Sequence, residues 1–206
     1  TVDLAGGSFV GDRRWMVVDA DRGSMVTGRQ HPKMLLIQAT LPASPSTVTG
    51  SLSLQAPTMP ERLTVPLGPM SPARNHTVET DVRVWDVHMQ GSDCGDDSSA
   101  WLSSYLASSP VRLVTTGPSY NRKCSPKYTP MALRTWLGAT PPVSFADGFP
   151  YLLIGEGSLQ YLNDRLAAAG ESAVEMERFR PNMVVKGVPA FDEDCWRVIR
   201  IGEVVF

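Results

Sequence analysis

The sequence is short of cysteine, of charge of one sign and of long apolar runs, and each shortage excludes a class of protein. Its 3 cysteines are odd in number and widely spaced, which argues against a disulfide framework and against a cysteine-type zinc site. A net charge of -2 provides no global positive field for nucleic acid or an anionic membrane surface. No stretch approaches the ~18 consecutive apolar residues of a membrane span. We therefore expect an intracellular protein that has no membrane span and does not bind nucleic acid directly.

Glycine and proline, by contrast, are abundant. The 206 residues include 17 of each, about 17% together, against an average of about 12%. Such a composition favours many short elements joined by tight turns over long helices. We therefore predict an α+β fold that is mainly β and has few helices.

Period-two alternation and short apolar runs predict strands along the chain. Residues 77–87 are typical of one half-buried strand, because Val78, Val82 and Val84 share a face. The other predicted strands are residues 14–19, 25–27, 34–40, 51–54, 111–115, 151–154 and 183–186.

Two segments predict helices. The first begins at residues 96–98, whose side-chain oxygens can cap a helix N-terminus, and it stops before Pro110. The second covers about residues 156–169, with a stripe of leucines on one face and Gly170 as its C-terminal stop.

The histidines do not form a metal-binding pattern. His31, His76 and His88 show no i, i+4 pairing and no local carboxylate arrangement of the metalloprotease type. The sequence therefore predicts no metal ligands among them.

The loop of residues 117–142 carries a basic cluster. Arg122, Lys123 and Lys127 are flanked by Tyr120 and Tyr128. Cationic groups beside aromatic rings can form a small anion-binding or partner-binding patch. A solvent-exposed loop has the same composition, so both interpretations stay open.

Three polar turns lie at the entrances of predicted strands, where simple strand patterning would place apolar residues. They are residues 11–15, 145–150 and 178–182. If the three strands are neighbours, Arg13 and Arg180 can supply fork-shaped donors to a phosphate or a pterin carbonyl. Asp147 and Asn182 can then hydrogen-bond ring nitrogens. The alternative is that these residues form ion pairs that tie the turns together.

In order and spacing, these turns and their surroundings resemble the MOSC superfamily, most closely its mitochondrial amidoxime reducing component branch. The resemblance rests on Gly11-Asp-Arg-Arg-Trp15, Gly91-Ser-Asp-Cys-Gly-Asp96, Phe145 to Pro150, Phe179-Arg-Pro-Asn182 and Glu193-Asp-x-Trp196. It covers nearly the whole chain apart from residues 41–72 and 119–142. It implies a MOSC-type β-barrel, with an N-terminal β-rich module and linking helix at residues 1–116 and a MOSC domain at residues 117–206.

The resemblance also implies a cofactor. In the family the molybdenum cofactor, a molybdopterin, lies between the two modules. Four residues match the family's cofactor contacts by position: Arg13, Asp147, Arg180 and Asn182. Gly148 and Phe149 occupy positions that are small and hydroxylated in the amidoxime reducers, so only backbone contacts are expected there.

The family's molybdenum-binding cysteine has no counterpart in this sequence. Cys94, Cys124 and Cys195 do not match it. We expect the matching cysteine to lie beyond Phe206, and we assign neither a metal ligand nor a catalytic residue within the chain.

The function implied by the resemblance is the two-electron reduction of N-hydroxylated substrates by a mitochondrial oxidoreductase. Its expected partners are cytochrome b5 and NADH-cytochrome b5 reductase. One alternative is a non-catalytic MOSC-like subunit of a larger assembly, to which the missing thiolate, the Gly148-Phe149 pair and the proline-rich insertion point. Another is the C-terminal domain of a molybdenum cofactor sulfurase.

Overall fold

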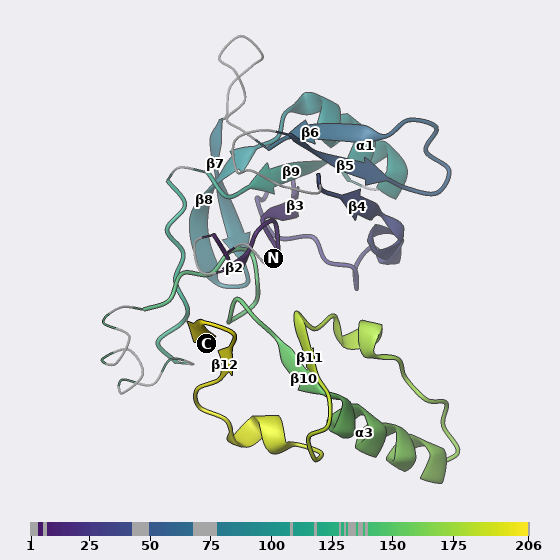
Figure 1. Cartoon of the computed structure of the whole chain (residues 1–206). Helices are drawn as coiled ribbons and strands as arrows, with labels where there is room; N and C mark the ends of the chain where they lie inside the picture. The colour runs from purple at the N-terminus through teal and green to yellow at the C-terminus, as the bar shows by residue number, and fades with distance from the viewer. Residues whose placement is uncertain are drawn as a thin grey trace. The chain divides into compact units, whose positions relative to one another are not determined.

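The computed structural model describes residues 4–5, 8–42, 50–67, 78–107, 109–117, 119–127, 129, 131, 135, 138 and 140–205. Contacts divide the chain into two compact units, Thr1–Pro150 and Tyr151–Phe206 (Figure 1). The division by contacts does not test the expected module boundary after residue 116, which stays a prediction. Within the described residues, no helix is long and apolar enough to cross a membrane.

A four-stranded antiparallel sheet forms the centre of the first unit. Its strand order is β3-β9-β8-β7, with β3 at Trp15–Asp19, β9 at Val111–Thr115, β8 at Val87–Asp93 and β7 at Glu79–Val84. Side chains alternate between its faces, so Val17 joins one hydrophobic cluster while Met16 and Val18 join another. Phe145 packs into the second cluster, which attaches the predicted polar turn at residues 145–150 to this sheet.

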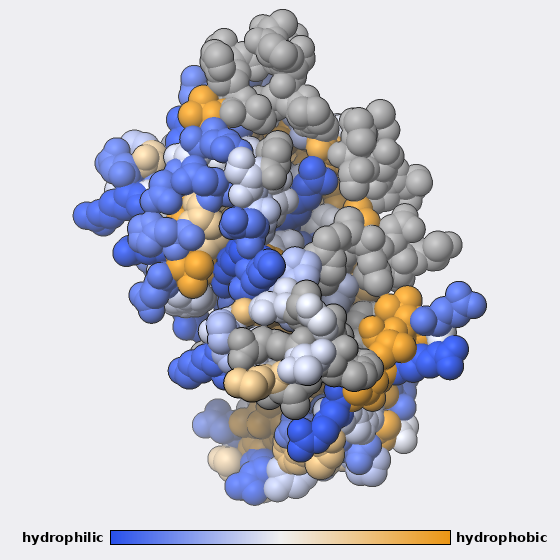
Figure 2. Space-filling model, turned by 90° about the vertical axis from the view of Figure 1, so that its left-hand side faces the viewer, coloured by the Kyte–Doolittle hydropathy of each residue, from blue (hydrophilic) through white to orange (hydrophobic). Residues whose placement is uncertain are grey.

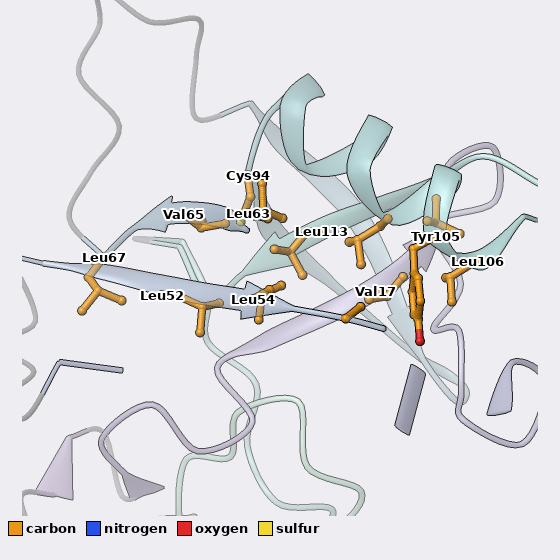
Figure 3. Packing of buried hydrophobic residues seen from close by; sticks show 13 residues of the cluster. Val17, Leu52, Leu54, Leu63, Val65, Leu67, Cys94, Tyr105, Leu106 and Leu113 are labelled. Atoms are coloured by element: carbon orange, nitrogen blue, oxygen red, sulfur yellow. The ribbon is translucent and has the colours of Figure 1, made fainter. Parts of the chain in front are cut away.

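The first cluster lies between this sheet, a second sheet and a helix. The second sheet contains β4 at Gln38–Thr40, β5 at Ser51–Gln55 and β6 at Leu63–Pro66, and the helix α1 covers Asp96–Leu106. Leucines of β5 and β6 meet Tyr105 and Leu106 of α1 in this core (Figure 3). Shorter elements in the same unit are β1 at Leu4–Ala5, β2 at Ser8–Phe9 and the 3-10 helix η1 at Pro32–Leu36.

The second unit is built on two parallel strands connected through a helix. β10 at Leu153–Gly155 pairs in parallel with β11 at Met183–Val185, and α3 at Glu156–Ala168 lies between them in sequence. A parallel pair needs such a crossover connection. The remaining elements are η2 at Met176–Phe179, η3 at Asp192–Cys195, β12 at Arg200–Ile201 and β13 at Val204–Val205.

The second unit buries little apolar surface. Among residues 151–205, only Gly155 is buried. Large apolar side chains remain exposed, among them Tyr161, Phe191, Val198, Ile201 and Val205. Apolar patches are also visible among the hydrophilic side chains on the face of the molecule drawn in Figure 2. Hydrogen bonds between polar groups therefore contribute much to holding this unit in its folded conformation.

The expected fold class is confirmed, because the chain is α+β and mainly β. The described strands form open sheets and not a closed barrel. Both predicted helices are present, and the second ends at Ala168, followed by Gly170 with φ +76°.

Three local predictions are wrong. The strand expected at residues 77–87 ends at Val84, because Trp85 and Asp86 form a turn and Val87 begins β8. Residues 34–40 divide into η1 and the short β4. The expected caps at residues 96–98 lie within α1, whose N-cap is Gly95 without a side-chain cap.

Candidate functional site

Arg13 lies in a tight turn between β2 and β3. The turn is closed by the Asp12 amide, which donates to the Phe9 carbonyl at 2.9 Å, and Arg13 itself has φ 48°. Its Nη1 donates to Asp12 Oδ2 at 2.7 Å. The left-handed backbone is uncommon for a residue other than glycine, so this turn holds an arginine where glycine would be less strained.

The structure brings the Arg13 turn and the Asp147 turn together within the first unit. The amide of Phe145 donates to the carbonyl oxygen of Arg13 at 3.1 Å. Two residues later, Asp147 is exposed and its Oδ1 accepts a hydrogen bond from Trp85 Nε1 at 2.9 Å. Two turns predicted from separate parts of the sequence are therefore joined by a backbone hydrogen bond two residues before Asp147.

Arg122 supports the Asp147 turn from the inside. Its side chain is buried and donates to three backbone carbonyl oxygens, those of Ser144, Ala146 and Asp147. The sequence leaves two interpretations open for this basic cluster, an anion-binding or partner-binding patch and a solvent-exposed loop. Arg122 fits neither, because its side chain is buried, whereas its neighbour Lys123 is exposed. Sequence reasoning missed this role because its carbonyl partners lie more than 20 residues away.

Tyr120, like Arg122, helps to hold the residues that lead into the Asp147 turn. Its hydroxyl donates to the Val143 carbonyl at 3.1 Å, and its ring meets the Phe145 ring edge-on with centroids 5.2 Å apart. Burial raises the pKa of Tyr120 to about 12, with Arg122 acting in the opposite direction. The hydroxyl is therefore a neutral donor at physiological pH. Tyr128, predicted beside it, lies outside the described residues.

A cavity of about 380 Å³ opens beside these turns in the first unit. Asp12 and Arg14 line it from the first turn, and Asn121 and Lys123 line it from the loop. The Arg14 side chain is anchored by donating to the Leu67 carbonyl at 2.9 Å. Together with Arg122, the lining has three cationic groups against one carboxylate, which is a chemistry suited to an anionic ligand.

In the second unit, Arg180 and Asn182 lie between η2 and β11. Arg180 has φ 53°, and its guanidinium makes no hydrogen bond or ion pair with any residue that the structure describes. Asn182 is bound to Leu152 twice, through its amide donating to the Leu152 carbonyl at 2.8 Å and its Oδ1 accepting from the Leu152 amide at 2.9 Å. The Asn182 side chain thus helps to hold the backbone at the start of β10.

Glu193 holds the start of α3, a role that the sequence did not reveal. Its Oε1 accepts hydrogen bonds from the Gly155 amide at 2.8 Å and from Ser158 Oγ at 2.6 Å. Burial acts to raise the pKa of Glu193, but the hydrogen bonds from Ser158 and Gly155 outweigh it and the pKa is lowered. Because 38 residues separate Glu193 from Gly155, no local capping pattern could indicate this contact.

The described cysteines do not form a metal centre. Cys94 and Cys124 are buried, and burial raises the pKa of both thiols, that of Cys94 to about 12. Cys195 is exposed. No cluster of metal-ligating side chains occurs among the described residues, to which His76 does not belong. The cationic groups that line the cavity, Arg14, Arg122 and Lys123, are of the type that binds an anionic group such as the phosphate of a pterin cofactor, whereas the described cysteines offer no prepared thiolate for a metal.

Two domain families match the chain. Residues 1–109 match the MOSC N-terminal beta barrel domain, and residues 140–206 match the MOSC domain.

Three relatives are similar along nearly the whole chain. Mitochondrial amidoxime-reducing component 1 of Danio rerio is 38% identical over 94% of this chain and 53% of its own length. Mitochondrial amidoxime reducing component 2 of Rattus norvegicus is 37% identical over 95% and 52%. Mitochondrial amidoxime reducing component 2 of Bos taurus is 35% identical over 94% and 51%. The chain thus spans about half the length of these relatives.

Proposed function

The chain belongs to the MOSC family, and from this premise we propose that it is the cofactor-binding part of a molybdenum-dependent oxidoreductase that reduces N-hydroxylated substrates. The observation that carries the proposal is its similarity, over more than nine-tenths of the chain, to proteins named for amidoxime reduction. The two clusters of polar residues, one in each unit, support it because their donor types suit a phosphate and a pterin.

The predicted site residues offer two kinds of chemistry in this proposal. Arg13 in the first unit and Arg180 in the second each carry a guanidinium that can bind an anionic group through charge-assisted hydrogen bonds. Asp147 in the first unit would accept an N–H of the pterin, and Asn182 in the second offers an amide group for hydrogen bonds to ring nitrogens. When bound, the molybdenum cofactor supplies a two-electron redox centre, while the protein orients it and tunes its electronics.

The overall reaction consumes two electrons and two protons, converts an N–OH group to N–H and releases one water molecule. We propose cytochrome b5, reduced by NADH-cytochrome b5 reductase, as the electron source. We also propose a mitochondrial location, which the names of the relatives support.

The second candidate is a non-catalytic MOSC-like subunit of a larger assembly, because fold alone does not establish function. Among the described residues, burial raises the pKa of the Cys94 and Cys124 thiols, so both stay protonated and are poor metal ligands under either candidate.

The test is the molybdenum and pterin content of the native protein, purified from a host that makes the cofactor. The informative variant is Arg180→Gly, because glycine accepts the left-handed backbone at this position without strain. Arg178→Ala is the matched control, since Arg178 is an exposed arginine in η2, two residues before Arg180, with no matching role.

We expect bound molybdenum and pterin in the wild type and in Arg178→Ala, and loss of most of both in Arg180→Gly with unchanged folding. Reduction of an amidoxime by the loaded protein, with a chemical reductant as electron source, should follow the same order. A folded wild type without molybdenum or pterin would support the non-catalytic candidate.

A further inference from the structure

Trp85 occupies a position that neither packing nor turn geometry explains. It lies in the two-residue turn between β7 and β8, has φ 54° and is 54% exposed. A left-handed conformation is rare for a bulky residue, and glycine or asparagine is the usual choice in such turns. A strained and exposed tryptophan indicates a functional requirement for its side chain.

The polar atom of this side chain has one specific partner. Trp85 Nε1 donates to Asp147 Oδ1 at 2.9 Å, although 62 residues separate the two. The β7–β8 turn thereby reaches the Asp147 turn, whose backbone is fixed independently by Arg122 Nη2 donating to the Asp147 carbonyl at 2.7 Å. The side chain and the backbone of Asp147 are therefore held by different residues.

This arrangement determines how the carboxylate can act. A carboxylate on an exposed turn rotates broadly about its last torsion. With Oδ1 accepting from the indole, Oδ2 is left as the acceptor, because it makes no hydrogen bond with a described residue. A group held in this way binds one N–H donor and loses less conformational freedom on binding.

We propose that Trp85 is a positioning residue, which fixes the Asp147 carboxylate so that Oδ2 accepts a single N–H of the pterin. The inference rests on the proposed function and extends it, since it assigns ligand orientation to a residue of the β7–β8 turn. A purely structural role would instead have Trp85 only fasten the turn to residues 145–150.

Two variants separate these roles. Trp85→Phe removes the donor and keeps an aromatic ring. Trp101→Phe is the matched control, because Trp101 Nε1 also donates one 2.9 Å hydrogen bond, in this case to the Glu61 carbonyl. For native protein loaded with molybdopterin, the rate of pterin loss and the free energy of unfolding in urea are measured for both variants.

Loss of one hydrogen bond to the carboxylate should make the pterin dissociate about fivefold to tenfold faster from Trp85→Phe. Trp101→Phe should retain pterin like the wild type, while the two variants unfold at similar urea concentrations. In an Asp147→Asn background, Trp85→Phe should add no further acceleration, because a positioning residue acts only through the group it positions.

Equal pterin retention in Trp85→Phe and Trp101→Phe would overturn the inference while leaving the proposed function intact. An additional, independent effect of Trp85→Phe in the Asp147→Asn background would also overturn it. A wild-type protein that carries no pterin at all would overturn the proposed function and this inference with it, so the two failures are distinguishable.

Discussion

Arg122 and Asp147 lie 25 positions apart in the sequence, and the guanidinium of the first donates to the backbone carbonyl of the second at 2.7 Å. The same buried guanidinium also satisfies the carbonyls of Ser144 and Ala146. A buried cation that bonds three carbonyl oxygens fixes the path of the backbone on both sides of Asp147. The shape of this turn therefore depends on a residue whose side chain is engaged with the backbone of residues 144–147.

Arg122→Met should lower the free energy of unfolding by about 3 kcal/mol, because several buried carbonyl oxygens lose their donor at once. Arg122→Lys should recover only part of this loss, since one ammonium group cannot reproduce the fork geometry. Urea unfolding measures both. Lys123→Met, at the exposed neighbouring position, should stay within about 0.5 kcal/mol of wild type. Equal losses of stability at positions 122 and 123 would contradict the role of Arg122 as the donor to these carbonyl oxygens.

Glu193 should give the protein a pH-dependent stability that Glu193→Gln lacks. Its pKa is lowered in the folded state from an ordinary value of 4.5. A lowered carboxyl pKa stabilises the fold fully above the ordinary value, and this contribution disappears as the pH falls through the folded value. The stability difference between wild type and Glu193→Gln, measured in urea, should therefore shrink on acidification.

At pH 7 we expect Glu193→Gln to cost about 1 kcal/mol, because hydrogen bonds to a neutral amide oxygen are weaker than those to a carboxylate. Glu171→Gln, at an exposed position just after α3, serves as the control and should leave both stability and its pH profile unchanged. If the stability difference between wild type and Glu193→Gln were constant across the acid range, the Glu193 carboxylate would not stabilise the start of α3 as described.

The three thiols should react with iodoacetamide at very different rates in the native protein. Burial raises the pKa of Cys94 to about 12, assisted by Asp93 and opposed by Arg14, and burial also raises the pKa of Cys124. The thiolate is the reactive form, so near pH 8 only the exposed Cys195 should be alkylated quickly. Peptide mass spectrometry identifies the labelled sites. Rapid native labelling of Cys94 would refute its buried, protonated state.

Gly157→Ala should destabilise the protein, although alanine in a helix is normally more favourable than glycine by about 1 kcal/mol. A Cβ at position 157 would lie 2.5 Å from the Val188 carbonyl oxygen and 3.1 Å from the Ala190 amide nitrogen. Both contacts are backbone and cannot move cheaply, so we expect a loss of about 2 kcal/mol in urea unfolding. Gln160→Ala, on the exposed side of α3, should change stability by less than about 0.5 kcal/mol.

The sequence predicted best where local rules decide the structure. The stripe of leucines and Gly170 placed α3 to within one residue at its C-terminal end. The prediction failed at Trp85, because a tryptophan in a left-handed turn carries no turn signal and another valine, Val87, follows soon after Val82 and Val84. Here a distant hydrogen bond to Asp147 accompanies a conformation that local propensity opposes.

The candidate site also contains some features that the sequence predicts and others that it does not. The spacing of the polar turns at Arg13 and Asp147 could be read from the sequence, and the structure links them. Arg122 and Glu193 could not be assigned roles, because each acts on backbone groups more than 20 residues away. Composition shows that a residue is charged, but only the folded chain shows which carbonyl or amide it meets.

The sparse burial in residues 151–205 has a thermodynamic consequence. Exposure of apolar surface produces most of the heat-capacity increase when a protein unfolds, which averages about 12–15 cal/mol/K per residue. Among the described residues 151–205 of this unit, Gly155 alone is buried, so little such surface is left to expose there. Its contribution to the heat-capacity change should fall below this average, so its stability should vary with temperature along a flatter curve than that of the unit containing the four-stranded sheet.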